Sequence, residues 1–186
     1  MQAAIRETPA RANSVDRSVE KYLSFHVGPE EFAVAVLSVR EIIGMQDVTA
    51  VPHTPPYLKG IINLRGKVIP VVDLRLKFGM PSAEYTQRTC IVVVDIAGED
   101  SRMLMGVVVD SVSEVLNVSP SDIESTPDFG EGVTIPYLRG IAKSKGKVKI
   151  LLDIDKVLST TEISGLGSML EGGVSRAGAH AESLAN

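Results

Sequence analysis

Apolar and polar residues alternate along much of the chain with the two-residue period of β-strands. Residues 21–27 (KYLSFHV) show this alternation, a turn signal follows at 28–31 (GPEE), and residues 32–36 return as the partner strand of a hairpin. The segment 39–43 (VREII) could be a short helix or a strand, and its β-branched residues favour the strand. A second set echoes this order, with strands predicted at 90–96, 103–109 and 112–118.

A unit of 22 residues occurs twice in the chain. Residues 57–78 (YLKGIINLRGKVIPVVDLRLKF) and 137–158 (YLRGIAKSKGKVKILLDIDKVL) align without gaps, 80 positions apart, and share eight identical residues. Each copy predicts a β-hairpin, with Gly66 or Gly146 supplying the positive φ of a tight turn, followed by a short helical segment. Pro70 has no N–H for a ladder, so we expect its strand to lie at an edge or to carry a bulge. The repetition indicates an internal duplication.

These elements predict an all-β protein with about ten strands in two sets of five. Frequent turn signals and the lack of a long helical pattern favour two small five-stranded β-barrels packed together, with short helical segments, over a sandwich or a βαβ fold. The predicted domain spans 19–163, with halves of about 19–85 and 86–163 that are free to exchange strands. The polar segment 1–18 and the Gly-, Ser- and Ala-rich segment 164–186 are predicted to be flexible.

Composition narrows the class of protein. Hydrophobic residues make up 44% of the 186 positions, enough for a packed core. The net charge of −4, the absence of Trp and the four Phe and four Tyr residues argue against nucleic-acid binding. A single cysteine excludes an intramolecular disulfide and indicates a reducing compartment. Without a signal peptide or an apolar run of membrane-spanning length, the sequence predicts a cytoplasmic protein that does not insert into membranes.

The sequence offers few groups for catalysis. None of the three histidines lies at a metal-ligand spacing, and no cofactor fingerprint is present, so we predict no metal, no cofactor and no catalytic residue. Cys90 begins an apolar run, which favours a small core residue over a nucleophile. Asp73 and Asp153 occupy equivalent positions in the two copies, which favours helix capping over a catalytic dyad. An enzyme with a cryptic site between the barrels is the alternative.

Basic residues near the two turns could contact partners. Lys143, Lys145, Lys147 and Lys149 alternate along KSKGKVK, which favours the solvent face of a hairpin over a site for an acidic partner. Arg65 lies at the tip of the first hairpin, where a solvated turn residue and an interface residue fit equally well. Without catalytic groups, the residues favour a protein that binds other proteins through barrel surfaces and sheet edges.

The order of the motifs resembles one family. F-x-V-G-x-E-E-F-A-V, V-R-E-I, T-P-P-Y-L-K-G-I-I-N-L-R-G-K-V-I-P-V-V-D-L-R and G-V-V-V-D-S-V-S-E-V-L occur in this order. Together they resemble the CheW family of bacterial chemotaxis coupling proteins, over about residues 21–159. The string N-L-R-G-x-x-x-P-V-x-D-L is specific to this family and to the related regulatory domain of the histidine kinase CheA.

The resemblance implies a fold of two packed SH3-like barrels, in agreement with the duplication. It implies an adaptor that couples methyl-accepting chemoreceptors to CheA by non-covalent contacts, in the cytoplasm and recruited to membrane-associated receptor arrays. One implied partner is the CheA regulatory domain, which would contact the first barrel at residues that are not assigned. The other is the signalling tip of a receptor. Its apolar end would pack in a groove between the barrels, while Arg65 would pair with a receptor acid or carbonyl. The groove residues that carry over are Val39, Glu41, Gly60, Asn63, Leu64 and Arg65.

Overall fold

The computed structural model describes residues 19–98, 101–126 and 135–158. The segments 1–18 and 164–186, predicted to be flexible, lie outside the described residues. The short helices are α1 (Leu74–Lys77) and α2 (Ile154–Leu158), with 3₁₀ turns η1 (Val36–Ser38) and η2 (Pro120–Asp122). The strands are β1 (Glu20–Val27), β2 (Glu30–Ala35), β3 (Val39–Gly44), β4 (Leu58–Leu64), β5 (Lys67–Asp73), β6 (Cys90–Ala97), β7 (Arg102–Val109), β8 (Ser111–Val118), β9 (Ile123–Glu124), β10 (Leu138–Ser144) and β11 (Lys147–Leu152).

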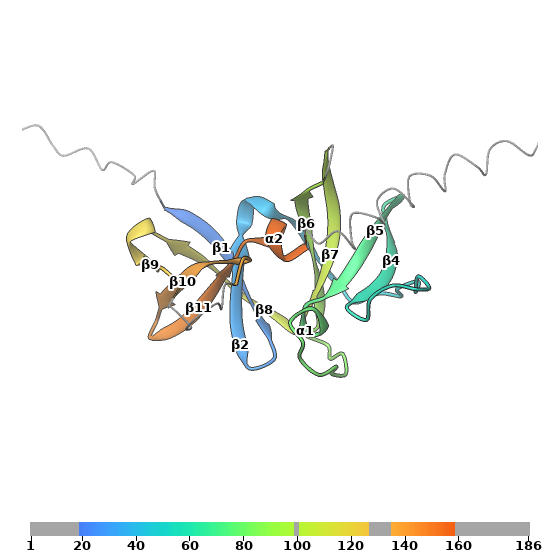
Figure 1. The fold of residues 1–186 in the computed structure, drawn as a ribbon, viewed down its shortest axis with the longest axis horizontal. Helices are drawn as coiled ribbons and strands as arrows, with labels where there is room; N and C mark the ends of the chain where they lie inside the picture. The colour runs from blue at the N-terminus through green and yellow to red at the C-terminus, as the bar shows by residue number, and fades with distance from the viewer. Residues whose placement is uncertain (1–18, 99–100, 127–134, 159–186) are drawn as a thin grey trace, which may run out of the picture.

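The strands form two sheets that stand side by side, with α1 and α2 near their junction (Figure 1). Sheet A has the order β8-β1-β2-β11-β10-β9, and sheet B has the order β3-β6-β7-β5-β4. The all-β class with short helices is therefore confirmed, as is the strand over residues 39–43. The closed five-stranded barrels are corrected to open sheets of six and five strands, because within the described residues no pairing joins β8 to β9 or β3 to β4.

Each sheet contains strands from both halves of the sequence. In sheet A, β2 pairs in parallel with β11, where Phe32 lies opposite Ile150. In sheet B, β5 pairs in parallel with β7, where Val71 lies opposite Gly106. The other ladders are antiparallel. Because β5 and β11 are equivalent strands of the duplicated unit, the two parallel pairings are also equivalent, although neither joins strands that follow one another in the chain.

The two copies of the duplicated unit share their local geometry. Both hairpins turn over two residues with positive φ, Arg65 (51°) and Gly66 (85°) in one and Lys145 (53°) and Gly146 (74°) in the other. The turn therefore needs positive φ at both positions, as in a type I′ turn, and not at the glycine alone.

Short helices follow both hairpins, and each begins at a capping aspartate. Asp73 accepts a hydrogen bond from the Leu76 N–H, and Asp153 accepts one from the Lys156 N–H, both at 3.3 Å. The predicted caps are therefore confirmed.

Pro70 lies in a strand that the sequence placed at an edge or at a bulge. Because β5 runs between β4 and β7, the edge prediction is wrong. The pairing with β7 nevertheless begins only at Val71, one residue after Pro70. The bulge lies on the neighbouring strand, between Leu58 and Gly60 of β4.

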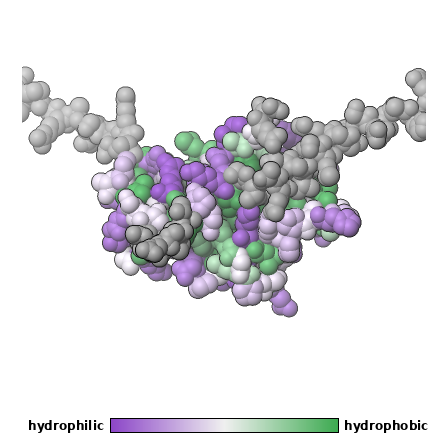
Figure 2. Space-filling model, in the orientation of Figure 1, coloured by the Kyte–Doolittle hydropathy of each residue, from purple (hydrophilic) through white to green (hydrophobic). Residues whose placement is uncertain are grey.

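Apolar residues fill three clusters whose members alternate along the strands. The largest cluster joins the two sheets and includes Phe25, Val92 and Val107. A second cluster lies on the other face of sheet A, and a third, which includes Val93, lies on the other face of sheet B. Figure 2 shows hydrophobic atoms near the middle of the visible face, where the two sheets meet. Successive residues of one strand therefore contribute to different cores.

Candidate functional site

The tip of the first hairpin carries a bidentate ion pair. Arg65 donates from Nη1 to Glu41 Oε1 at 2.6 Å and from Nη2 to Glu41 Oε2 at 2.8 Å. Glu41 lies on β3 and Arg65 follows β4, and these strands are the two opposite edges of sheet B. The sheet therefore curves until its edges meet through these side chains. The Arg65 side chain is still 76% exposed, so its remaining N–H groups face solvent.

Two further predicted residues shape this tip. Asn63 accepts a hydrogen bond on Oδ1 from the Gly66 N–H at 2.8 Å, across the turn. Leu64 is half-buried and packs against the apolar cluster of sheet B. The structure therefore brings together Glu41, Asn63, Leu64 and Arg65, which we call the first tip.

Val39 and Gly60 lie apart from the first tip. Val39 is partly buried and packs against the cluster between the sheets. Gly60 is buried, with φ +139°, and a Cβ there would lie 2.0 Å from the Thr49 carbonyl oxygen. That contact arises because Thr49 and Ile61 exchange two backbone hydrogen bonds of 2.9 Å. Gly60 therefore has a structural role, since it lets the connector between β3 and β4, residues 45–57, pass against β4.

A buried carboxylate near the first tip was not foreseen. Asp95 of β6 accepts hydrogen bonds from Arg40 Nε at 2.9 Å and from Arg102 Nε at 2.8 Å, and Arg102 also reaches the Asp95 carbonyl. The hydrogen bond from Arg40 and the charge of Arg102 hold the pKa of Asp95 below its usual range. The one signal in the sequence was a lone acid inside the apolar run 90–96.

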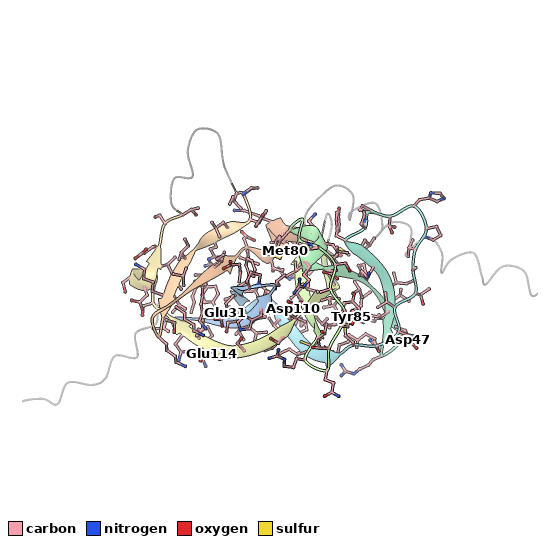
Figure 3. All side chains as sticks on the ribbon, turned by 90° about the horizontal axis from the view of Figure 1, so that it is seen from below. Glu31, Asp47, Met80, Tyr85, Asp110 and Glu114 are labelled. Carbon is pink, nitrogen blue, oxygen red and sulfur yellow. The ribbon has the colours of Figure 1, made fainter. Side chains whose placement is uncertain are left out.

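The second hairpin repeats the tip with other residues. Lys145, equivalent to Arg65, donates to Glu114 at 2.7 Å. Lys149 is 2% exposed and donates to Glu31 at 2.7 Å and to Glu114 at 3.1 Å. These two glutamates are labelled in Figure 3, where they lie in the same half of the molecule. The solvent-face prediction therefore holds for the exposed Lys143, Lys145 and Lys147. It is wrong for Lys149, because β11 carries that residue inside sheet A.

Asp110, between the two sheets, accepts hydrogen bonds that link them. Asp110 links β7 of sheet B to β8 of sheet A, and its carboxylate accepts from Arg75 at 2.6 Å and from the Gly28 N–H at 2.7 Å. In the second copy, Asp155, equivalent to Arg75, accepts from the Ala97 N–H of β6 at 2.7 Å. The second residue of each short helix therefore contributes to a polar contact between the two sheets.

Acid should destabilise the protein through these carboxylates. Burial favours the neutral form of Asp110, but the hydrogen bonds from Arg75 and the Gly28 N–H hold its pKa below the usual range, as Arg40 does for Asp95. A lowered folded pKa stabilises the fold above about pH 4, and this contribution is lost as the pH falls through the folded pKa. We expect the urea midpoint to fall steeply below about pH 4, and the Asp95→Asn variant to show a shallower fall. Equal slopes would contradict this assignment.

Cys90 and an apolar pocket complete the description of the possible sites. Cys90 packs against the core between the sheets, and burial raises the pKa of its thiol, as expected for a core residue. An apolar pocket of about 200 Å³ is lined by residues that include Phe32, Phe78, Met80 and Tyr137. None of the six predicted groove residues lines it.

Neither a metal site nor a membrane-spanning helix is found among residues 19–98, 101–126 and 135–158. No three His, Cys, Asp or Glu side chains there gather as a metal ion would require. No helix in these ranges is both long and apolar enough to cross a membrane.

Comparison with known proteins identifies the family. Residues 21–162 match the model of the CheW-like domain. The chain is 39% identical over 140 residues to the chemotaxis protein CheW of Rhizobium meliloti, covering 75% of this chain and 88% of that protein. It is 35% identical over 145 residues to the chemotaxis protein CheW of Klebsiella aerogenes, covering 78% and 85%.

A solved structure agrees with these matches. The crystal structure of the scaffolding protein TtCheW from Thermoanaerobacter tengcongensis superposes with a TM-score of 0.68 at 30% identity. The match covers 77% of this chain and 95% of that one. The two-sheet fold, the duplicated hairpins and these matches agree, and the chain belongs to the CheW family of chemotaxis scaffold proteins.

Proposed function

We propose that this protein is a cytoplasmic adaptor that couples methyl-accepting chemoreceptors to the histidine kinase CheA by non-covalent contacts. Membership in the CheW family supports a scaffold role. The observation that carries the proposal is the first tip, where an exposed guanidinium is held in a fixed orientation by Glu41. A partner can then bind without first ordering a long, mobile side chain.

The receptor contact is proposed at Glu41, Asn63, Leu64 and Arg65. The free N–H groups of Arg65 would donate to a carbonyl or carboxylate at the end of a receptor helical hairpin. The half-buried Leu64 would give the apolar part of the contact. Val39 would extend it toward the junction of the sheets, and Gly60 would act only by holding β4 in shape.

Signal transfer would need no chemistry by this chain. The kinase regulatory domain would bind a second surface, so that receptor and kinase are held in a fixed relation while the receptor changes state. Each contact can be modest, because recruitment to a membrane-associated array adds avidity. In this role the protein would use no catalytic residue, metal or cofactor.

Arg65→Glu should weaken binding to a receptor signalling-tip fragment at least 10-fold, as expected for an interface anchor. The reversed charge would repel Glu41 and remove the donors. Binding to the CheA regulatory domain should not change. Because the pair is exposed, its loss should cost the fold less than about 1 kcal/mol. Calorimetric titration with each partner, together with circular dichroism, would measure these effects.

Lys145→Glu is the matched control. It reverses the cation of the equivalent ion pair on the second hairpin, where Lys145 faces Glu114. We expect this variant to bind the receptor fragment as the unmodified protein does. Equal losses from both substitutions, or no loss from Arg65→Glu, would remove the receptor site from the first tip.

A further inference from the structure

Strand β3, which carries Glu41, contains a β-bulge that changes the face of the sheet on which its side chains lie. Val39 lies opposite Val94 of β6, but Glu41 lies opposite Val93, the adjacent residue, so Arg40 is the extra residue of a β-bulge. In a regular strand, Val39 and Glu41 would share a face, because side chains repeat every two residues. The bulge separates them.

The packing of the side chains on either side of the bulge shows this change of face. Val39 packs with Val94 in the cluster between the sheets. Ile43, two residues after Glu41, packs with Val93 in the cluster of sheet B. Glu41 is thereby placed on the side of sheet B where Arg65 lies. In a regular strand without the bulge, keeping Val39 in its core would place Glu41 on that same face, away from Arg65.

Arg40 is fixed by the buried carboxylate of Asp95. Its Nε donates to Asp95 Oδ2 at 2.9 Å, and its Nη2 contacts the same oxygen. The other carboxylate oxygen, Oδ1, accepts from Arg102 of β7 at 2.8 Å. The carboxylate is 7% exposed, whereas both arginines are more than half exposed. One buried acid therefore ties the bulge of β3 to β6 and β7.

The equivalent strand of sheet A has the same irregularity, fixed by different residues. β8 shifts register against β1 between Leu23 and Phe25, just where Glu114 points to Lys145. There Ser24 Oγ donates to the Glu114 carbonyl at 3.1 Å and accepts from the Glu114 N–H at 3.3 Å. In both sheets, therefore, a β-bulge stabilised by hydrogen bonds lies next to the glutamate that pairs with the basic residue of the hairpin turn.

We propose that Asp95, through Arg40, positions Glu41 against Arg65 and so sets the receptor-binding geometry of the first tip. Asp95 and Arg40 are positioning residues, since neither needs to touch the receptor. This inference rests on the proposed function for its consequence in binding. The effect of Arg40 on the orientation of Arg65, however, does not depend on any partner and can be measured in the free protein.

Arg40→Ala tests the link in the full-length protein. Because Arg40 is exposed, we expect the variant to stay folded but to lose affinity for the receptor signalling-tip fragment about 5- to 10-fold, while binding to the CheA regulatory domain stays the same. In a double-mutant cycle, Arg40→Ala should have no further effect on receptor binding in an Arg65→Ala background. Additive losses would show that Arg40 acts independently of Arg65 and would overturn the proposal.

Side-chain N–H signals of Arg65 in NMR provide a readout without a partner. A bidentate pair restricts rotation of the guanidinium, and we expect Arg40→Ala and Asp95→Asn to release it while Lys145→Ala does not. Unchanged Arg65 signals in both variants would overturn the inference. If instead these signals change but Arg65→Glu keeps receptor affinity, the positioning stands and the proposed receptor site fails.

Discussion

Lys149→Ala is expected to lower the free energy of unfolding by about 3–5 kcal/mol. The Lys149 side chain is 3% exposed and its main partner, the Glu31 side chain, is 10% exposed, so truncation would leave a buried carboxylate without its cation. Glu114 is partly exposed and can turn to water, so most of the cost comes from Glu31. Urea denaturation followed by circular dichroism would measure the loss. An exposed-pair variant, Lys145→Ala, should cost less than about 1 kcal/mol.

The duplicated sheet supplies a second control. Ile69 and Leu104 occupy in sheet B the positions of Lys149 and Glu31, and both contribute to an apolar cluster. Lys149→Ile combined with Glu31→Leu should therefore recover most of the stability that Lys149→Ala loses, because no charge stays buried. Lys149→Ile alone should remain destabilised. If Lys149→Ile alone recovers as much stability as the double variant, the loss reflects packing volume and not the unpaired charge.

Gly60→Ala is expected to destabilise the fold by about 3 kcal/mol or more. The added Cβ would lie 2.0 Å from the Thr49 carbonyl oxygen and 3.0 Å from the Ala50 Cα, both backbone atoms that cannot turn away. The connector would have to leave β4 and break its two hydrogen bonds to Ile61. The thermal midpoint should fall accordingly, and hydrogen exchange at Ile61 should accelerate.

Gly66→Ala separates this close approach from backbone strain. Gly66 also has positive φ, at +85°, but nothing lies within 4 Å of a Cβ there. Its cost should be limited to the conformational penalty of about 1–2 kcal/mol. Equal losses at Gly60 and Gly66 would assign the effect to φ alone. Receptor binding by folded Gly60→Ala protein would then test whether this glycine contributes beyond shape.

Local features of the fold could be predicted from the sequence because they depend on residues close together in the chain. The hairpins follow from alternation and a turn glycine, and the caps at Asp73 and Asp153 follow from their place before a short helix. The ion pair of Arg65 could not be predicted in this way, because Glu41 lies 24 residues earlier and on the opposite edge of the sheet.

Two other features needed the three-dimensional pairing. Lys149 belongs to an alternating basic run that looks solvent-exposed, and only the neighbouring β2 brings Glu31 to it inside sheet A. The bulge at Arg40 is hidden because Val39 and Glu41 have the spacing of one strand face, while their partners on β6 show two faces. A bulge is defined by the register between two paired strands, which the alternation pattern of one strand does not contain.

The parallel pairing of β2 with β11 has a consequence for synthesis. Phe32 and Ile150 are neighbours in the sheet but lie 118 positions apart, the difference between their residue numbers. On a ribosome, β2 emerges early and has only β1 beside it until nearly the whole domain has been translated. Contacts between such distant segments slow folding. Sheet A is therefore completed late, and during that interval β2 presents an unpaired edge to which other strands can pair.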